Sequence, residues 1–156
     1  MKKSWVLIPA VASVSLTGCG SLEPSTALTV TVSGHSDQVS RERGGQERCS
    51  YFDGWLSSGD RVLLRDSEGE ILGVSDLRAH EPFRDSSQGP GGTTVVCSWE
   101  ASFQDVPANR LAYTLEVADF GEVALSRESI GQGEVSLRPR SAMGVLAGED
   151  VLFAVH

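Results

Sequence analysis

The sequence of 156 residues predicts an all-β protein, a two-sheet sandwich of about seven or eight short strands. Apolar and polar residues alternate along most of the chain, which is typical of strands with one face on a core and the other in water. Turn-forming residues separate these strands at regular intervals. No segment after residue 27 shows a sustained helical period, and the nearest is a short turn expected over 125–130 with Ser126 as its cap.

The N-terminal segment predicts export. Lys2 and Lys3 precede an apolar run over residues 5–16, which Pro9 interrupts and which is too short to cross a bilayer as a permanent helix. A positive region followed by a short apolar region is typical of a secretion signal. We therefore expect residues 1–18 to be a signal peptide that is removed.

The end of this leader predicts a lipid anchor. Leu16-Thr17-Gly18-Cys19 resembles a bacterial lipobox, in which small residues precede a cysteine that carries a diacylglyceryl thioether. Cys19 would then be the lipidated start of a polar tether over 19–27, and a single domain would follow over 28–156. The expected location is the extracytoplasmic face of the cell membrane. The alternative is a plain signal peptide, which would leave Cys19 as a free thiol.

The exported domain is expected to be acidic. The 13 basic residues include Lys2 and Lys3, so the chain after the leader carries 11 arginines against 21 Asp and Glu. Phosphates and anionic headgroups repel such a domain. Nucleic acid is therefore not an expected partner, and the membrane contact is expected to come from the lipid.

The alternation of apolar and polar residues predicts where each strand lies along the chain. Runs at 28–32, 61–66, 70–75, 94–103, 112–119, 122–126, 134–138 and 150–156 all read as strands. In the fourth run one face collects Val95, Cys97, Trp99, Ala101 and Phe103. Asp66-Ser67-Glu68-Gly69-Glu70 predicts a hairpin turn in which Gly69 takes a positive φ, and Phe120-Gly121 predicts a similar turn.

Two polar segments, 34–48 and 79–93, are longer than a hairpin requires and are expected to be loops. The first contains Arg41, Arg43 and Arg48, and arginine is favoured in protein and carboxylate recognition because its planar fork donates two hydrogen bonds. These arginines are candidate partner contacts. The alternative is a pair of solvated loops without a partner.

The cysteine count predicts one disulfide. After lipidation of Cys19, Cys49 and Cys97 remain, and an even remainder in an exported chain indicates a bridge, with two free thiols as the alternative. No CxxC motif is present, and His35, His80 and His156 have no metal-ligand spacing. No metal or other cofactor is expected. The bridge would hold the ends of the two polar segments near each other as one composite surface.

Four stretches together are similar to a known group of proteins: Cys49, GWLSSGDRVLLRDSEGEILGVSDL (54–77), CSWEASFQDVP (97–107) and YTLEVADFGEVALSRESI (113–130). They resemble secreted and lipid-anchored actinobacterial proteins whose domains are similar to transthyretin-like, or carboxypeptidase-regulatory-like, sandwiches. The match covers about half of the exported chain. It implies an Ig-like or transthyretin-like sandwich with a disulfide, and it brings no activity with it.

The chain shows no recognisable catalytic constellation. It lacks a Gly-x-Ser-x-Gly elbow, and a Ser-His-Asp set would have to recruit His35 or His80 from a polar segment. The run Asp66 to Glu70 departs from the EF-hand pattern, and the glycines over 86–92 are followed by a strand instead of a phosphate-binding helix. A solvated turn and a flexible loop are the simpler interpretations.

An aromatic cluster is the remaining candidate site. Tyr51, Phe52 and Trp55 follow Cys49 within a few residues, and such rings stack on sugars and peptides in many binding sites. The alternative is that they cap the core beside the disulfide. The sequence therefore predicts a non-enzymatic envelope lipoprotein that binds an envelope protein or glycan. A small envelope hydrolase or a carbohydrate-binding accessory domain using residues 51–55 is the second hypothesis.

Overall fold

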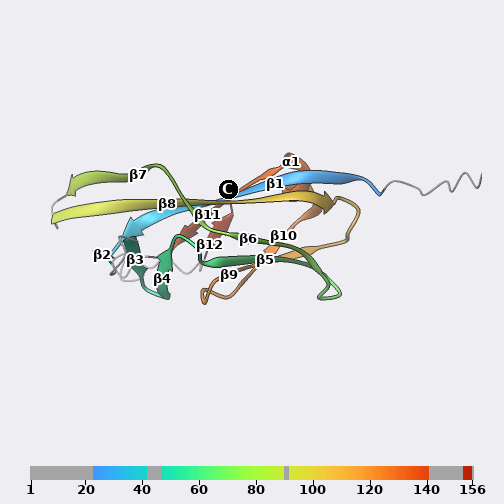
Figure 1. Cartoon of the computed structure of the whole chain (residues 1–156), viewed down its shortest axis with the longest axis horizontal. Coiled ribbons are helices and arrows are strands. Elements are labelled where there is room, and N and C mark those ends of the chain that lie inside the picture. Colours follow the sequence, from blue (N-terminus) through green and yellow to red (C-terminus); the bar gives the residue numbers. More distant parts are fainter. Residues whose placement is uncertain (1–22, 42–46, 90–91, 141–152, 156) are drawn as a thin grey trace, which may run out of the picture.

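The computed structural model describes residues 23–41, 47–89, 92–140 and 153–155. In these ranges the chain forms twelve strands and one helix (Figure 1): β1 (Ser25–Ser36), β2 (Gln38–Arg41), β3 (Glu47–Tyr51), β4 (Gly54–Ser57), β5 (Arg61–Asp66), β6 (Ile71–Asp76), β7 (Arg78–Gly89), β8 (Gly92–Pro107), β9 (Tyr113–Val117), β10 (Glu122–Leu125), α1 (Arg127–Gln132), β11 (Glu134–Pro139) and β12 (Phe153–Val155). The all-β sandwich and the disulfide are confirmed. The expected strand count was too low, and a third sheet is present.

A five-stranded sheet in the order β12-β11-β1-β8-β7 forms one layer. Its central pair, β1 and β8, is antiparallel and runs in register from Ser25 opposite Pro107 to Ser36 opposite Val95, with one bulge. β11 pairs with the other edge of β1 in parallel, so that Thr31 lies opposite Ser136. The alternation along β1 therefore buries one row of its side chains and leaves the other row on the outer face of the sheet.

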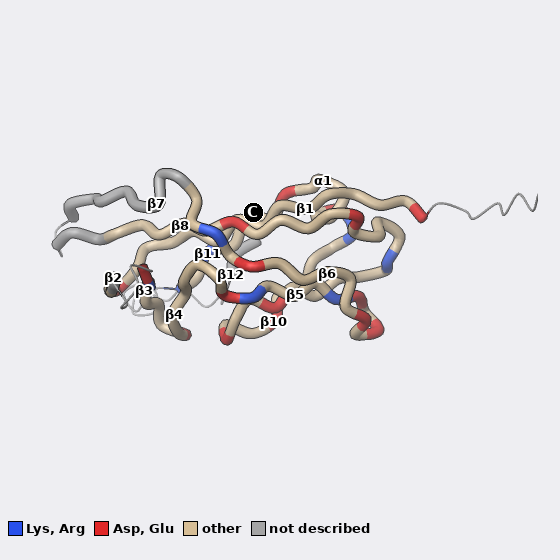
Figure 2. Tube along the Cα trace, in the orientation of Figure 1, with Lys and Arg blue, Asp and Glu red and all other residues tan. Residues whose placement is uncertain are grey.

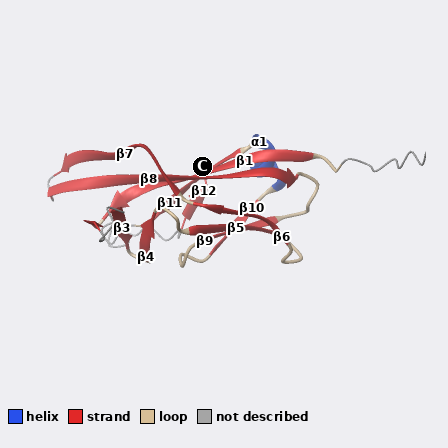
Figure 3. Cartoon of the chain, in the orientation of Figure 1, coloured by secondary structure: helices blue, strands red, loops and turns tan. Residues whose placement is uncertain are grey.

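A four-stranded sheet in the order β10-β9-β5-β6 forms the second layer, beneath the first in Figure 3. The buried residues of both sheets meet in one core, whose largest members include Trp99, Tyr113, Leu28, Leu64 and Leu115. The expected turn between β5 and β6 is confirmed. Gly69 has φ +84°, and the Asp66 carboxylate accepts hydrogen bonds at 2.9 Å from the backbone N–H groups of Glu68 and Glu70.

The turn at Phe120-Gly121 is also confirmed, since Gly121 has φ +90° between β9 and β10. The short helical turn expected over 125–130 is the helix α1. Ser126 is its N-cap and accepts a hydrogen bond from the backbone N–H of Ser129, while Gly133 closes the helix in the left-handed conformation.

The two polar segments were wrongly expected to be loops. β1 continues through Ser36, and β2 and β3 pair across residues 38–51, so most of 34–48 is strand. β7 pairs with β8 from Gly89 down to Arg78, with an interruption between Ala79 and Arg84. Figure 1 shows this pair reaching beyond the rest of the sandwich. Backbone hydrogen bonds form these strands, and they need no alternation of apolar residues.

One glycine in β6 lets the two layers approach closely. A Cβ added to Gly73 would lie 2.7 Å from Cδ1 of Phe103, a buried ring that β8 contributes to the core. Real Cβ contacts essentially never come that close, so any side chain here would displace the ring or the strand. The spacing of β6 and β8 therefore depends on the absence of a side chain at Gly73.

We predict that Gly73→Ala lowers the free energy of unfolding by about 1 to 3 kcal/mol, because the new methyl group overpacks Phe103. Chemical denaturation of the purified protein measures the change. Gly131→Ala is the matched control, since Gly131 lies in α1 and a methyl group added there would meet nothing within 4 Å, so this change should be neutral or slightly stabilising. Equal effects of the two substitutions would contradict the close approach of β6 to Phe103.

Candidate functional site

The disulfide joins the third sheet to the five-stranded sheet. The three-stranded sheet has the order β2-β3-β4, and Cys49 of β3 is bonded to Cys97 of β8 with a Cα–Cα distance of 6.6 Å. Both cysteines are fully buried, so the predicted bridge is confirmed as part of the core. The bond ties a small sheet, which could bury little apolar surface by itself, to the centre of the larger one.

Tyr51 belongs to this core and was wrongly predicted as a partner contact. Its ring packs edge-on against Trp99 and Phe120, with centroid distances of 6.3 and 6.1 Å, and only 5% of the residue is exposed. Burial raises the pKa of the Tyr51 hydroxyl above its usual range, and the negative charge of Asp37 raises this pKa further. Tyr51 therefore stays neutral, and its ring packs the inner face of the three-stranded sheet against Trp99 and Phe120.

The opposite face of the three-stranded sheet carries Trp55. Strand register places Gln38, Ser50 and Trp55 in one row across β2, β3 and β4, and Arg48 lies in the neighbouring row. Cys49 and Leu56 alternate with these residues and are buried, so the row faces outward. We call Gln38, Arg48, Ser50 and Trp55 the outer face of the three-stranded sheet.

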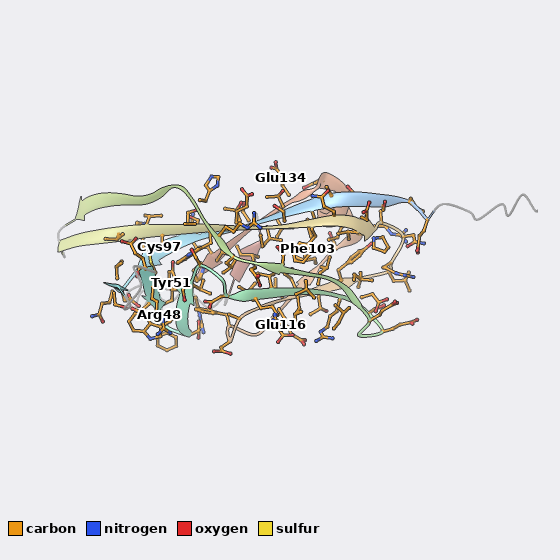
Figure 4. All side chains as sticks on the ribbon, in the orientation of Figure 1. Arg48, Tyr51, Cys97, Phe103, Glu116 and Glu134 are labelled. Carbon is orange, nitrogen blue, oxygen red and sulfur yellow. A yellow bond between two sulfur atoms is a disulfide. The ribbon has the colours of Figure 1, made fainter. Side chains whose placement is uncertain are left out.

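Trp55 is 39% exposed, and the guanidinium carbon of Arg48 lies 5.3 Å from its ring centroid. Arg48 is labelled in Figure 4. At this distance the cation interacts with the negative face of the ring and restricts the Arg48 side chain. The outer face thus presents a large aromatic ring with an arginine already ordered beside it. Both residues were among the candidates found in the sequence.

Phe52 has a different neighbourhood, at the turn between β3 and β4. It is 54% exposed, and the guanidinium carbon of Arg140 lies 5.4 Å from its ring centroid. Arg140 also donates two hydrogen bonds to Asp53, from Nε at 3.1 Å and from Nη2 at 2.8 Å, while its backbone carbonyl accepts from the N–H of Phe52. These contacts clamp the turn to the end of β11.

The three aromatic residues of 51–55 therefore have different environments: Tyr51 lies in the core, Phe52 lies beside Arg140 at the turn, and Trp55 lies on the outer face. Sequence analysis missed Gln38 and Arg140, because both lie far from the aromatic residues along the chain. Arg41 ends β2, but the structure does not describe its side chain, and Arg43 and the lipobox with Cys19 lie outside the described residues. Of the three candidate arginines, Arg48 is the one whose side chain the structure describes.

The outer face lies far from the described N-terminal end. In Figure 1 the chain enters β1 at one end of an elongated molecule, and β2, β3 and β4 lie toward the other end. Leu111 and Arg110 lie at the entry end, where Arg110 approaches Glu23 at 3.5 Å and Asp66 at 3.7 Å. Figure 2 shows the acidic β5–β6 turn away from the three-stranded sheet.

The two described histidines, His35 and His80, occupy exposed positions. His80 Nδ1 lies 3.3 Å from Glu100 Oε2 on the surface, and His35 is exposed at its position in β1. Over the described ranges, no group of three or more His, Cys, Asp or Glu residues could hold a metal ion. A search of the same ranges finds no helix long and apolar enough to span a membrane.

Comparison with known proteins yields no relative: no family model, no curated protein and no solved structure matches the chain. The resemblance to transthyretin-like domains stays a prediction.

The disulfide predicts the behaviour of two thiols. Under denaturing conditions without reductant, Cys49 and Cys97 should resist alkylation, and intact mass should show two added tags only after reduction. Replacing both with alanine should lower the free energy of unfolding by up to about 4 kcal/mol, the chain-entropy value for a loop of 48 residues. Alkylation of both cysteines in unreduced exported protein would contradict the bridge.

Proposed function

We propose that this protein is a lipid-anchored lipoprotein on the extracytoplasmic face of the cell membrane, and that it is a non-enzymatic module that binds another envelope component. The lipobox at Leu16-Thr17-Gly18-Cys19 supports the anchor, and the disulfide agrees with an oxidising compartment. The outer face of the three-stranded sheet is the proposed contact surface.

The position of Trp55 is the observation that carries this proposal. β1 begins at Ser25 and ends at Ser36, beside the three-stranded sheet, so this strand alone spans about 40 Å at roughly 3.3 Å per residue. A chain tethered before β1 would hold the outer face at its far end. An exposed tryptophan there is accessible to components beyond the membrane surface.

The contacts of Trp55 favour a protein over a glycan as the partner. Sugar rings stack on bare aromatic faces, whereas Arg48 occupies a face of the Trp55 ring. Tryptophan and arginine are the residues most enriched among those that dominate protein interfaces. The glycan-binding and hydrolase alternative loses Tyr51, which is buried, and would depend on Phe52 and Trp55.

The anchor predicts lipid labelling at Cys19. Metabolically supplied radioactive palmitate should enter the wild-type protein, and Cys19→Ala should abolish both the label and sedimentation with membranes. Ser21→Ala, which keeps the cysteine, is the control and should behave as wild type. Membrane retention of an unlabelled Cys19→Ala protein would refute the lipid anchor.

The contact surface predicts a specific loss on truncation of Trp55. Immobilised wild-type protein is incubated with detergent-solubilised envelope, with isolated wall glycans in a parallel experiment. Trp55→Ala should reduce recovery of the bound component by about tenfold or more, because tryptophans at interface centres commonly contribute 2 kcal/mol or more.

Leu111→Ala is the matched control for this experiment, since Leu111 is 87% exposed in the loop between β8 and β9 at the other end of the molecule. It should leave recovery unchanged. Undiminished recovery with Trp55→Ala would place the contact surface elsewhere, and recovery of glycans alone would favour the carbohydrate-binding alternative.

A further inference from the structure

A hollow on the solvent side of the five-stranded sheet is separate from the Trp55 surface. It lies over the parallel pair of β1 and β11 and has a volume of about 470 Å³. Its described lining consists of Thr31, Ser33, Ser136, Leu137 and Arg138. Small-molecule sites generally have volumes of about 300 to 1,000 Å³, so the hollow is large enough for a ligand of one or two rings. By contrast, a second hollow beside β6 and β8 holds about 110 Å³.

Strand register brings the polar groups of this hollow together. Thr31 and Ser136 lie directly opposite each other in the parallel ladder, and Ser33 and Arg138 are the next outward positions along the same two strands. Three hydroxyl groups and one guanidinium group thus share one face, although 102 residues or more separate the contributions of β1 and β11 in the sequence. Hydroxyls can donate and accept hydrogen bonds, while the guanidinium only donates.

Arg138 differs from three other arginines of the described structure in its ion pairing. Arg65, Arg110 and Arg140 form ion pairs with Glu116, Asp66 and Asp53. Arg138 is exposed and has no ion pair with any described residue, and no described carboxylate lines the hollow. In a chain with more acidic than basic residues, this leaves a guanidinium available to a ligand anion.

We propose that this hollow binds a small hydroxylated carboxylate, of which a sugar acid is the simplest example. The guanidinium fork of Arg138 would pair with both oxygens of the carboxylate, and Thr31, Ser33 and Ser136 would exchange hydrogen bonds with ligand hydroxyls. Leu137 is the one apolar residue of the described lining, and its side chain is buried in the core, so the side chains that the described residues present to the hollow are polar or charged.

A singly charged carboxylate fits the surroundings better than a phosphate. Glu100 lies opposite Thr31 on the other side of β1, and Glu134 lies opposite Thr29, so two carboxylates flank the site. His80 Nδ1 is 3.3 Å from Glu100. The two carboxylates already outweigh the one guanidinium, so each further negative charge on a ligand is repelled. A carboxylate brings one charge, whereas phosphate carries more charge and is usually held by several cations or by free backbone N–H groups. The N–H groups of central strands are occupied in the ladder.

Titration of the isotope-labelled protein with D-glucuronate, followed by amide NMR, tests this proposal. Glucuronate should shift the resonances of Thr31, Ser33, Ser136 and Arg138 in a saturable way, and D-glucose, which lacks the carboxylate, should bind at least about tenfold more weakly. Inorganic phosphate at the same ionic strength is the third probe. Shifts produced by phosphate as strongly as by glucuronate would overturn the carboxylate assignment.

Two arginine variants complete the test. Arg138→Gln should weaken glucuronate binding about tenfold or more while leaving the thermal midpoint unchanged, since an exposed charge contributes little to folding. Arg61→Gln makes the same charge change at an exposed position of β5, in the other sheet, and should bind as wild type. Equal binding by both variants, or no saturable shift in the wild type, would refute the site. Trp55→Ala should bind glucuronate normally, so this result is independent of the proposed partner surface.

Discussion

The antiparallel pairing of β1 with β8 is the constraint on which the rest of the structure depends. These two strands stay paired along the whole of β1, from Ser25 opposite Pro107 to Ser36 opposite Val95. The other strands of the five-stranded sheet extend from this pair: β11 and then β12 on the side of β1, and β7 on the side of β8. The inward faces of the pair supply Val32 and Trp99 to the core, so the same ladder also supports the four-stranded sheet.

The far end of the ladder is also where the third sheet attaches. Cys97 of β8 bonds to Cys49 of β3, and Tyr51 packs edge-on against Trp99 at the same level. A three-stranded sheet with few buried side chains gains its order from this covalent and aromatic contact. Arg140 adds a second attachment by binding Asp53 at the turn. The outer face with Trp55 is therefore presented on a supported platform.

The ladder places the two proposed sites on different faces. Outward residues of β1 line the hollow with Arg138, while the strands that follow β1 carry Trp55. A protein with both would combine a small-molecule site along its length with a macromolecular contact toward one end. Their separation in space means that the two can be tested by separate substitutions.

Some features were determined by the local sequence. The alternation over 94–103 predicted the inward row of Cys97, Trp99 and Phe103, because a strand at a boundary between core and water must repeat every two residues. The turn at Gly69 and the cap at Ser126 were likewise predictable, since each depends on the conformation of a few neighbouring residues. The pairing of Cys49 with Cys97 was predictable from the cysteine count once Cys19 was assigned to the lipid anchor.

Other features were decided only by the tertiary structure. The polar segments form strands because their backbone groups pair with those of β3 and β8. Such pairing does not require a particular pattern of side chains, so the sequence pattern did not reveal it. The sequence did not distinguish the environments of Tyr51, Phe52 and Trp55. Strand alternation and the turn place Tyr51 in the core, Phe52 beside Arg140 and Trp55 on the surface. The grouping of Thr31 with Ser136 and Arg138 required a parallel pairing between the two ends of the domain, and pairings over such distances depend on the whole fold.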